Sequence, residues 1–208
     1  MRMTLYYVHD PMCSWCWAFR PTWERIVAAL PAGIEVRRLL GGLAPDTDQP
    51  MPAALRDQLQ ATWRRIEQVV PGTRFNFAFW SDCAPRRATY PACRAVVAAG
   101  LQGEQHGEAM IRAIQHAYYL EARNPSDTAT LVALAAELGL DPERFAADLG
   151  AAATQAEVER QIAQGRAMGA DSFPSLVLAT PVETHLLAHD YNDPAPVLRQ
   201  IERLLAAA

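Results

Sequence analysis

The stretch that indicates the fold of this chain is Leu5-Tyr6-Tyr7-Val8, followed after a short turn by Cys13-Ser14-Trp15-Cys16. A short apolar strand that leads into a C-x-x-C motif at the start of a helix is typical of a dithiol redox site. Positions i and i+3 of a first helical turn share one face, so the two sulfurs can close a small disulfide ring. The unpaired N–H groups and partial positive charge of a helix N-terminus also favour a thiolate at Cys13.

The composition of the 208 residues predicts one folded domain, or one domain with a large insertion. The net charge is −4 and the sequence has no basic stripe, which argues against nucleic acid as a partner. No run approaches the roughly 18 apolar residues that a membrane span needs. Because the N-terminus runs directly into the first predicted strand, we expect no signal peptide and a cytoplasmic protein.

The cysteines favour redox chemistry over a structural or metal site. Four cysteines are too few for a disulfide scaffold, and in a reducing compartment a C-x-x-C pair is catalytic or metal-binding. Zinc needs four ligands, but the sequence has no second C-x-x-C, and the spacing of Cys83 and Cys93 is not a usual half-site. We therefore expect no metal and no bound cofactor, since the electrons would reside in the two thiols. An inert dithiol is the remaining alternative.

Apolar periodicity and turn residues predict the order of the elements. Strands are expected at 3–8 and 34–40, with a helix from Cys13 to about Leu30 between them that Pro21 should kink. A loop is expected at 44–52, and an extended aromatic patch at Phe75, Phe77 and Phe79. Helices are expected at 53–70, from Thr89 onward, and at 104–121, 126–139, 141–150 and 154–169. Strands at 175–179 and 183–188 and a helix from Asp193 complete the chain.

Two of these helices carry expected capping signals. Thr89 is expected to cap its helix, with Pro91 in the first turn, and Thr154 to Glu157 reads as a capping box. The whole order is βαβ, a helical block, then ββα. It predicts an α/β fold with a large helical insertion between the second and third strands: residues 1–43 and 170–208 form the sheet domain and 44–169 the insertion.

This arrangement, with C-x-x-C at the first helix, resembles the thioredoxin superfamily. Pro21 stands five residues after Cys16, where helices of that superfamily carry a kinking proline, and Phe173-Pro174 precedes the third strand, where they place a cis-proline. The helical insertion resembles the DsbA-like branch. The stretches 10–17, 88–94 and 116–121 are similar to the cytosolic FrnE-like group of predicted disulfide isomerases, and the resemblance covers essentially the whole chain.

The resemblance implies roles for the residues at the site. Cys13 would attack a substrate disulfide as a thiolate, and Cys16 would resolve the mixed disulfide. A cis Pro174 would leave the backbone of Phe173 free to pair with an extended substrate segment, and would keep metal away from the dithiol. An ordinary trans proline is the alternative. Phe173 is expected to shape the substrate groove, with a core phenylalanine as its alternative.

The residues around the dithiol depart from the pattern in places. Ser14 and Trp15 are the dipeptide that tunes the redox poise, and they lack the histidine that DsbA has there. Trp15 is expected to be exposed and to contact substrate, whereas Trp17 and Trp23 are expected in the core.

Tyr7 occupies the position, six residues before Cys13, where thioredoxin and DsbA place a buried acid. A proton relay for Cys16 must therefore come from elsewhere or be absent. Asp10 is expected as a turn or cap residue and His9 as a surface or packing residue. Cys93, on an apolar helix face, is expected to be buried and inert, although a second redox pair or a regulatory disulfide with Cys83 stays open.

The sequence thus predicts a thiol–disulfide oxidoreductase, or disulfide isomerase, that exchanges disulfides with protein thiols or with glutathione. Arg86, Arg87 and Arg94 could bind a glutathione carboxylate, but a solvated charged face is the expectation. One alternative function is a glutathione-dependent isomerase or transferase of the kappa-class-like branch, whose members typically carry serine at the first motif position. The other is a redox-inactive, chaperone-like binding protein.

Overall fold

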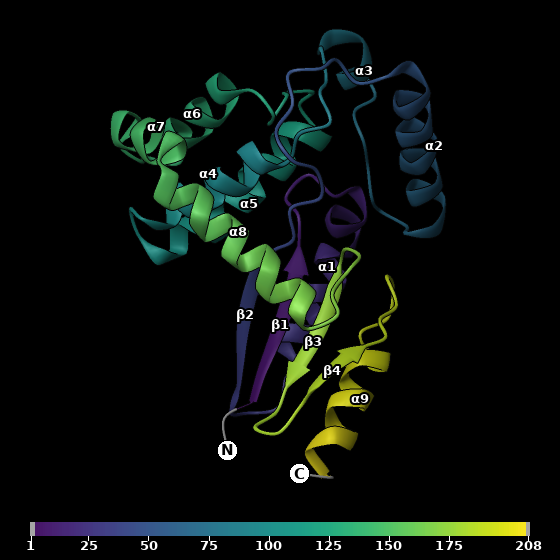
Figure 1. The fold of residues 1–208 in the computed structure, drawn as a ribbon. Helices are drawn as coiled ribbons and strands as arrows, with labels where there is room; N and C mark the ends of the chain where they lie inside the picture. Colours follow the sequence, from purple (N-terminus) through teal and green to yellow (C-terminus); the bar gives the residue numbers. More distant parts are fainter. Residues whose placement is uncertain (1–2, 207–208) are drawn as a thin grey trace.

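The strand β1 (Met3–His9) lies inside the sheet because its side chains are apolar toward both faces: Leu5 and Val8 are both fully buried. In the computed structural model, which describes residues 3–206, β1 pairs in parallel with β2 (Ile34–Leu40) and antiparallel with β3 (Ser175–Ala179). Strand β4 (Thr184–Leu187) pairs antiparallel with β3, which gives the order β2-β1-β3-β4. The carboxyl end of β1 points toward the helical half of the molecule (Figure 1).

Helices cover both faces of the sheet. Helices α1 (Ser14–Ala28) and α9 (Ala195–Ala206) share one apolar cluster with the side of β1 that carries Leu5, and this cluster includes Trp23 and Ile201. Helix α8 (Ala152–Ala167) lies on the opposite face, where Ile162 packs with Leu40 of β2. Gly165 of α8 lies so close to the sheet that a Cβ at this position would stand 3.1 Å from Val8.

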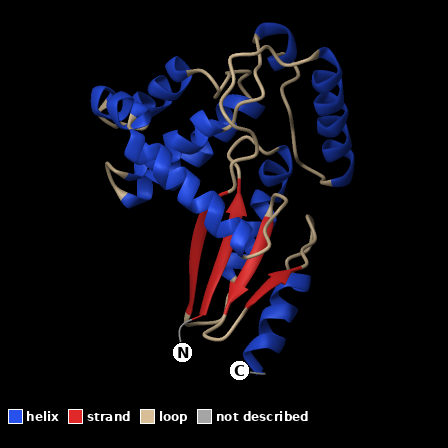
Figure 2. Ribbon diagram, viewed as in Figure 1, coloured by secondary structure: helices blue, strands red, loops and turns tan. Residues whose placement is uncertain are grey.

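The remaining helices form the second half of the molecule, beyond the carboxyl end of β1 (Figure 2). They are α2 (Ala53–Val69), α3 (Phe79–Asp82), α4 (Tyr90–Gly100), α5 (Glu104–Tyr119), α6 (Thr128–Glu137) and α7 (Pro142–Gly150). Their core is rich in aromatic rings, with Trp63 stacked on Phe75 at a centroid separation of 4.8 Å. Met12 and Trp17, on either side of the C-x-x-C, belong to the same core, which joins this half to the dithiol.

The predicted βαβ, helical block and ββα order is confirmed. The division into 1–43 with 170–208 and 44–169 stays a prediction; α8, placed in the insertion by that division, packs on the sheet. No helix within residues 3–206 combines the length and the apolar character needed to cross a membrane.

Three local expectations were wrong in detail. Phe79 does not continue an extended segment but begins α3, because the chain turns at Asn76, whose carbonyl accepts from the N–H of Phe79. Helix α8 begins at Ala152, directly after α7, so Thr154 lies inside its first turn and forms no capping box. Thr89 does precede α4, but its hydroxyl makes no capping bond and is used by Asp10 instead.

Candidate active site

The two motif cysteines occupy the first turn of α1. Cys13 is the N-cap residue, with an extended backbone (φ −83°, ψ 117°), and its carbonyl accepts from the N–H of Trp17 at 3.0 Å. Its own N–H donates to the carbonyl of Asp10 at 3.0 Å, which closes the turn before the helix. Cys13 keeps 6% of its surface exposed, whereas Cys16 has none. Cys13 is therefore the thiol of the pair that an incoming sulfur can reach.

The environment favours a thiolate at Cys13 over one at Cys16. A hydrogen bond from the Cys16 thiol is the main cause that lowers the pKa of Cys13; burial opposes it, and the N–H groups of Cys16 and Trp15 assist. Burial, together with the interaction with Cys13, raises the pKa of Cys16 well above its ordinary value. Cys13 is thus the nucleophilic thiolate of the pair, and Cys16 is the thiol that stays protonated.

The segment before β3 faces the dithiol. The peptide bond between Phe173 and Pro174 is cis, and the thiol of Cys13 lies 3.5 Å from the carbonyl oxygen of Phe173. The ring of Phe173 is half-buried and packs on the cluster of Val8 and Leu39. A Cβ on Gly41 would lie only 2.1 Å from Cε1 of Phe173, so this ring position requires glycine at 41. Phe173 thus gives its carbonyl to the site and its ring to the packing behind it.

The tryptophans of α1 differ in burial. Trp17 and Trp23 lie in the core, as predicted. Trp15 is only half-buried, not fully exposed as expected, because its ring packs against Tyr191 with centroids 4.8 Å apart. Ser14 is buried, at 9% exposure. The dipeptide between the two cysteines therefore borders the site without standing free in solvent.

Asp10 has a larger structural role than the turn residue predicted from the sequence. Its fully buried carboxylate accepts from the N–H of Met12 at 2.8 Å, which is the expected turn. It also accepts from the N–H of Leu43 and from the hydroxyl of Thr89, both at 2.7 Å, and from the thiol of Cys93 at 3.7 Å. Burial nevertheless raises the pKa of Asp10. One carboxylate therefore joins the dithiol turn to two distant segments of the chain.

The other two cysteines take no part in the dithiol. All four thiols are free, so the structure contains no bond between Cys83 and Cys93. Cys93 is fully buried, and burial followed by the charge of Asp10 raises its pKa well above the usual value. Cys83 is half-buried, and its thiol donates to the carbonyl of Ala122 at 3.0 Å. The predicted burial of Cys93 is confirmed, and an unreactive thiol stays the expectation for this environment.

Tyr7 occupies the position, six residues before Cys13, at which the resemblance predicts a buried acid. Its ring stacks on His9 and on Trp23, with centroids 4.8 Å and 4.4 Å apart. Burial, followed by the charges of Cys16 and Cys13, raises the pKa of Tyr7 well above its ordinary value. Tyr7 therefore stays protonated and uncharged at neutral pH. It cannot replace a carboxylate as the acceptor of the Cys16 proton.

His9 is a buried packing residue, which is one of the two outcomes expected for it, and it borders a small cavity that reaches Cys16. Burial, followed by the charge of Arg38, lowers the pKa of His9 to about 3, so its imidazole is neutral at neutral pH. The cavity has a volume of about 20 Å³, enough for one water molecule. Among residues 3–206, Nε2 of His9, Nε1 of Trp23 and Oε1 of Gln115 line it without a protein hydrogen-bond partner.

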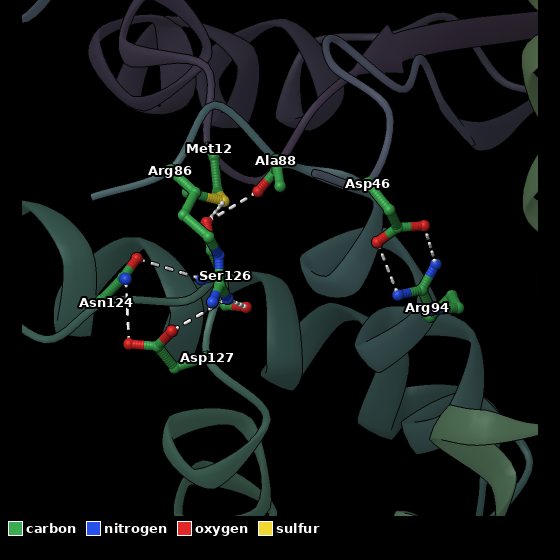
Figure 3. Close-up of polar contacts among 8 residues, drawn as sticks. All are labelled: Met12, Asp46, Arg86, Ala88, Arg94, Asn124, Ser126 and Asp127. Carbon is green, nitrogen blue, oxygen red and sulfur yellow. Dashed lines mark hydrogen bonds and ion pairs between the residues drawn. The ribbon is translucent and has the colours of Figure 1, made fainter. Parts of the chain in front are cut away.

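The arginines singled out as possible carboxylate ligands are mostly engaged (Figure 3). Arg86 donates to the carbonyl of Ser126 and pairs with Asp127 at 2.9 Å, which fixes the loop beside Met12. Arg94 pairs with Asp46 through two hydrogen bonds of 2.7 Å and 2.8 Å. Both side chains are therefore structural. Arg87 is half-buried, and its charge acts on Asp10, although its side chain forms no hydrogen bond or ion pair with any of residues 3–206.

No group of three or more His, Cys, Asp or Glu side chains that could hold a metal ion occurs among residues 3–206. What the geometry offers is a pair of thiols with unequal acidity, a backbone carbonyl beside the more acidic one, and a polar cavity beside the other. This arrangement suits thiol–disulfide exchange, in which one sulfur attacks and the second displaces the product.

Known proteins resemble this chain over most of its length. A family model described as thioredoxin matches residues 6–191. A candidate protein disulfide isomerase from Nitrosomonas europaea has a TM-score of 0.85 and 27% identity, covering 100% of this chain and 99% of that one. The cytosolic disulfide reductase DsbM from Pseudomonas aeruginosa has a TM-score of 0.78 and 28% identity, covering 99% and 100%, and has also been solved with GSH.

A curated relative is the ClpXP adapter protein SpxH from Halalkalibacterium halodurans, which is 25% identical over 179 residues. The match covers 84% of this chain but 58% of the relative, so the chain spans less than two thirds of the length of that protein.

Proposed function

Because this chain belongs to the thioredoxin family, we propose that it is a thiol–disulfide oxidoreductase in which Cys13 is the nucleophile and Cys16 the resolving thiol. The predicted thioredoxin fold with a helical insertion, and the resemblance to the DsbA-like branch, are confirmed by the family match and the structural neighbours. The observation that carries the proposal is the asymmetry of the two thiols. Cys13 is reachable and has a lowered pKa, whereas Cys16 is covered and has a raised one.

The reaction proceeds in two exchanges. The Cys13 thiolate attacks one sulfur of a substrate disulfide; a mixed disulfide forms, and the other substrate sulfur leaves as a thiolate that takes up a proton. Cys16 then gives up its proton and attacks the sulfur of Cys13. The substrate's first sulfur leaves as the second thiol, and Cys13 and Cys16 become a disulfide. Two electrons pass from the dithiol to the substrate, and an oxidised dithiol runs the same steps in reverse.

The residues around Cys13 hold the substrate. The carbonyl of Phe173, 3.5 Å from the attacking sulfur, accepts an N–H from an extended substrate segment, so that the segment adds to the chain as a short strand. Pro174 fixes the direction of that segment, and Ser14 and Trp15 border it on the side of α1. The structural support for this arrangement is the position of these four residues around one thiol.

The substrates we propose are protein disulfides, with reduction or isomerisation as the outcome, and glutathione as the partner that resets the dithiol. The likeness to a cytosolic disulfide reductase, which has also been solved with GSH, supports glutathione and a cytoplasmic location. The likeness to a candidate isomerase supports isomerisation. The kappa-class-like alternative is disfavoured, because Cys13 stands where those enzymes typically carry serine.

A reduction assay with insulin tests the proposal. The wild type should accelerate the reduction of insulin by a thiol reductant, and Cys13→Ser should abolish the effect. Equal acceleration by the two proteins would remove Cys13 from the mechanism. A glutathione-dependent turnover that survives Cys16→Ser would instead indicate the kappa-class-like reaction.

A second function, binding without redox chemistry, is favoured by one observation: the sequence similarity to SpxH, an adapter protein. Suppression of the aggregation of a denatured client separates it from the first. If the variant in which Cys13 and Cys16 are both serine suppresses aggregation as well as the wild type, and neither exchanges disulfides, the binding function holds and the redox function fails.

A further inference from the structure

A cavity of about 650 Å³ runs along α1 on the side away from the sheet, and no step of the exchange reaction described above uses it. Its walls are one face of α1 from Trp17 to Arg25, the segment 69–74 after α2, part of α5, and the residues Tyr191 and Asn192. We call it the α1 groove. Its volume lies within the range of about 300–1,000 Å³ that is typical of sites for small ligands.

The α1 groove is positively charged in a chain whose net charge is −4. Arg20, Arg25 and Arg74 line it, and among residues 3–206 no aspartate or glutamate does. Local concentration of one sign of charge in a concave site attracts ligands of the opposite sign. The groove therefore favours an anionic occupant over a cationic one.

The three guanidinium groups form no close ion pair with a carboxylate of residues 3–206, although the charge of Glu24 acts on Arg20. Arg20 lies over the ring of Trp17 at 4.5 Å, and Arg25 donates to the hydroxyl of Thr22 at 2.9 Å and to a backbone carbonyl at 2.6 Å. Arg74 is exposed, and no residue in the described part of the chain hydrogen-bonds to its side chain. Within residues 3–206, none of the three lies within 4.0 Å of a carboxylate oxygen. They are free to pair with carboxylates of a ligand, which arginine binds through two parallel hydrogen bonds.

The α1 groove begins one helical turn beyond Cys13, and neither motif cysteine lines it. Trp17 and Pro21 follow Cys13 by one and two helical turns, about 5.4 Å each, so the groove starts one turn along the same helix. Tyr191 also lines the groove, and its ring packs against that of Trp15, the residue before Cys16, with centroids 4.8 Å apart. A substrate held at Cys13 would lay the residues next to its own sulfur along this groove.

We propose that the α1 groove binds the part of the substrate next to its reacting sulfur and selects peptidic thiols that carry carboxylate groups. This inference rests on the proposed exchange activity. The carboxylates come either from acidic side chains of a protein segment or from the ends of a small thiol peptide such as glutathione. In both cases Arg74 and Arg20 pair with them, while Trp17 and Tyr191 pack against the chain of the ligand.

The test compares three peptide disulfides that differ only in two residues beside the cysteine: Glu-Glu, Gln-Gln or Lys-Lys. The wild type should show a kcat/KM for the Glu peptide at least about fivefold above that for the Gln peptide, and the Lys peptide should be the poorest. Arg74→Glu should abolish or reverse this order. Arg199→Glu on the exposed face of α9, which makes the same change in net charge, should leave it intact. The preference should also shrink as salt is raised.

Oxidised glutathione, used as a fourth substrate, separates the two sources of carboxylate. If Arg74→Glu reduces oxidised glutathione more slowly than wild type but keeps the same order of kcat/KM among the three peptides, the groove binds the small thiol peptide. If Arg74→Glu changes the order of kcat/KM among the peptides, the groove binds acidic protein segments. Equal kcat/KM for the Glu and Gln peptides, with no effect of Arg74→Glu on glutathione, would overturn the inference. So would equal effects of Arg74→Glu and Arg199→Glu.

The Gln peptide keeps this test separate from the proposed function. If wild type exchanges the Gln peptide but shows no charge preference, the groove proposal fails alone. If wild type exchanges none of the peptides, the proposed function fails. Binding to the groove is then measured without turnover, by the fluorescence anisotropy of a labelled, cysteine-free Glu peptide. The two proteins compared are Cys13→Ser and Cys13→Ser/Arg74→Glu. Tighter binding to the first protein supports the groove, and equal binding overturns it.

Discussion

The hydroxyl of Thr89 donates a hydrogen bond of 2.7 Å to the buried carboxylate of Asp10, and so ties the turn before the dithiol to the start of α4. The two residues are 79 positions apart in the sequence. The same carboxylate acts on Cys13, since its negative charge is one of the causes that raise the pKa of that thiol. Asp10 therefore affects both the position and the acidity of the nucleophile.

Asp10→Asn should lower the pKa of Cys13, because a negative charge that opposes the thiolate is removed. It should also cost about 1–3 kcal/mol of stability, since the amide offers one oxygen where two oxygens accept four donors. The rate of alkylation by iodoacetamide as a function of pH measures the first effect, and urea unfolding the second.

Thr89→Val is the matched control for this prediction. It removes one of the four donors and leaves the carboxylate charge in place, so it should reduce stability without lowering the pKa of Cys13. A pKa of Cys13 that is the same in wild type and Asp10→Asn would show that the carboxylate does not tune the nucleophile.

His9 should make stability depend on pH. Its pKa is about 3 in the folded protein and about 6.5 when unfolded, so between these values the unfolded chain binds the extra proton. Stability is therefore full above the unfolded pKa and is lost as pH falls below it, by about 2 kcal/mol from pH 7 to pH 5. His9→Phe keeps the ring stacked on Tyr7 and removes the titration, so this part of the slope should vanish.

Urea unfolding at several pH values measures that slope. His106→Gln, on the surface of α5, controls for the loss of a histidine elsewhere and should keep the dependence of the wild type. If His9→Phe and wild type lose stability in parallel between pH 7 and pH 5, the buried imidazole is not the group responsible.

The close approach of Phe173 to Gly41 should be essential to the geometry of the site. In Gly41→Ala the new methyl group would lie 2.1 Å from Cε1 of Phe173, so the ring must move and its carbonyl, 3.5 Å from Cys13, should move with it. We expect a loss of about 1–3 kcal/mol of stability and a slower exchange reaction. Urea unfolding and insulin reduction measure the two.

A second substitution at Phe173 tests whether that ring causes the effect. Phe173→Leu alone should cost stability, but Gly41→Ala should cost less in the Phe173→Leu background than in the wild type, because a smaller side chain leaves room for the methyl group. Additive losses in the double variant would mean that Gly41→Ala acts through another contact.

The sequence predicted the dithiol more completely than its surroundings. The strand, C-x-x-C and helix are local patterns, so β1, Cys13, Cys16 and α1 were all identifiable from neighbouring residues. The sequence predicts a turn residue at Asp10, which its bond to Met12 confirms, but its bonds to Leu43 and Thr89 join segments far apart in the chain. No local pattern carries that information, because it depends on how the helical half packs on the sheet.

The misplaced capping box has a similar cause. Thr154 and Glu157 have the spacing of a capping box, but α7 ends at Gly150 and α8 begins at Ala152, so the helix is already under way at Thr154. Helix α8 packs on β2 through Val158 and Ile162, which lie one and two turns beyond Thr154. The tertiary contact outweighs the local preference of one threonine, which is worth about 1 kcal/mol.

Cys16→Ser should trap the reaction at its midpoint. Cys13 would still attack a substrate disulfide, but serine cannot displace the substrate, so a covalent Cys13–substrate complex should accumulate and disappear only on addition of an external thiol. Non-reducing electrophoresis and the mass of the complex measure it. Cys83→Ser changes the half-buried thiol outside the dithiol and should trap nothing, and Cys13→Ser should form no complex. A complex that forms equally with Cys13→Ser would move the nucleophile to another cysteine, and the raised pKa and full burial of Cys93 make that residue a poor candidate.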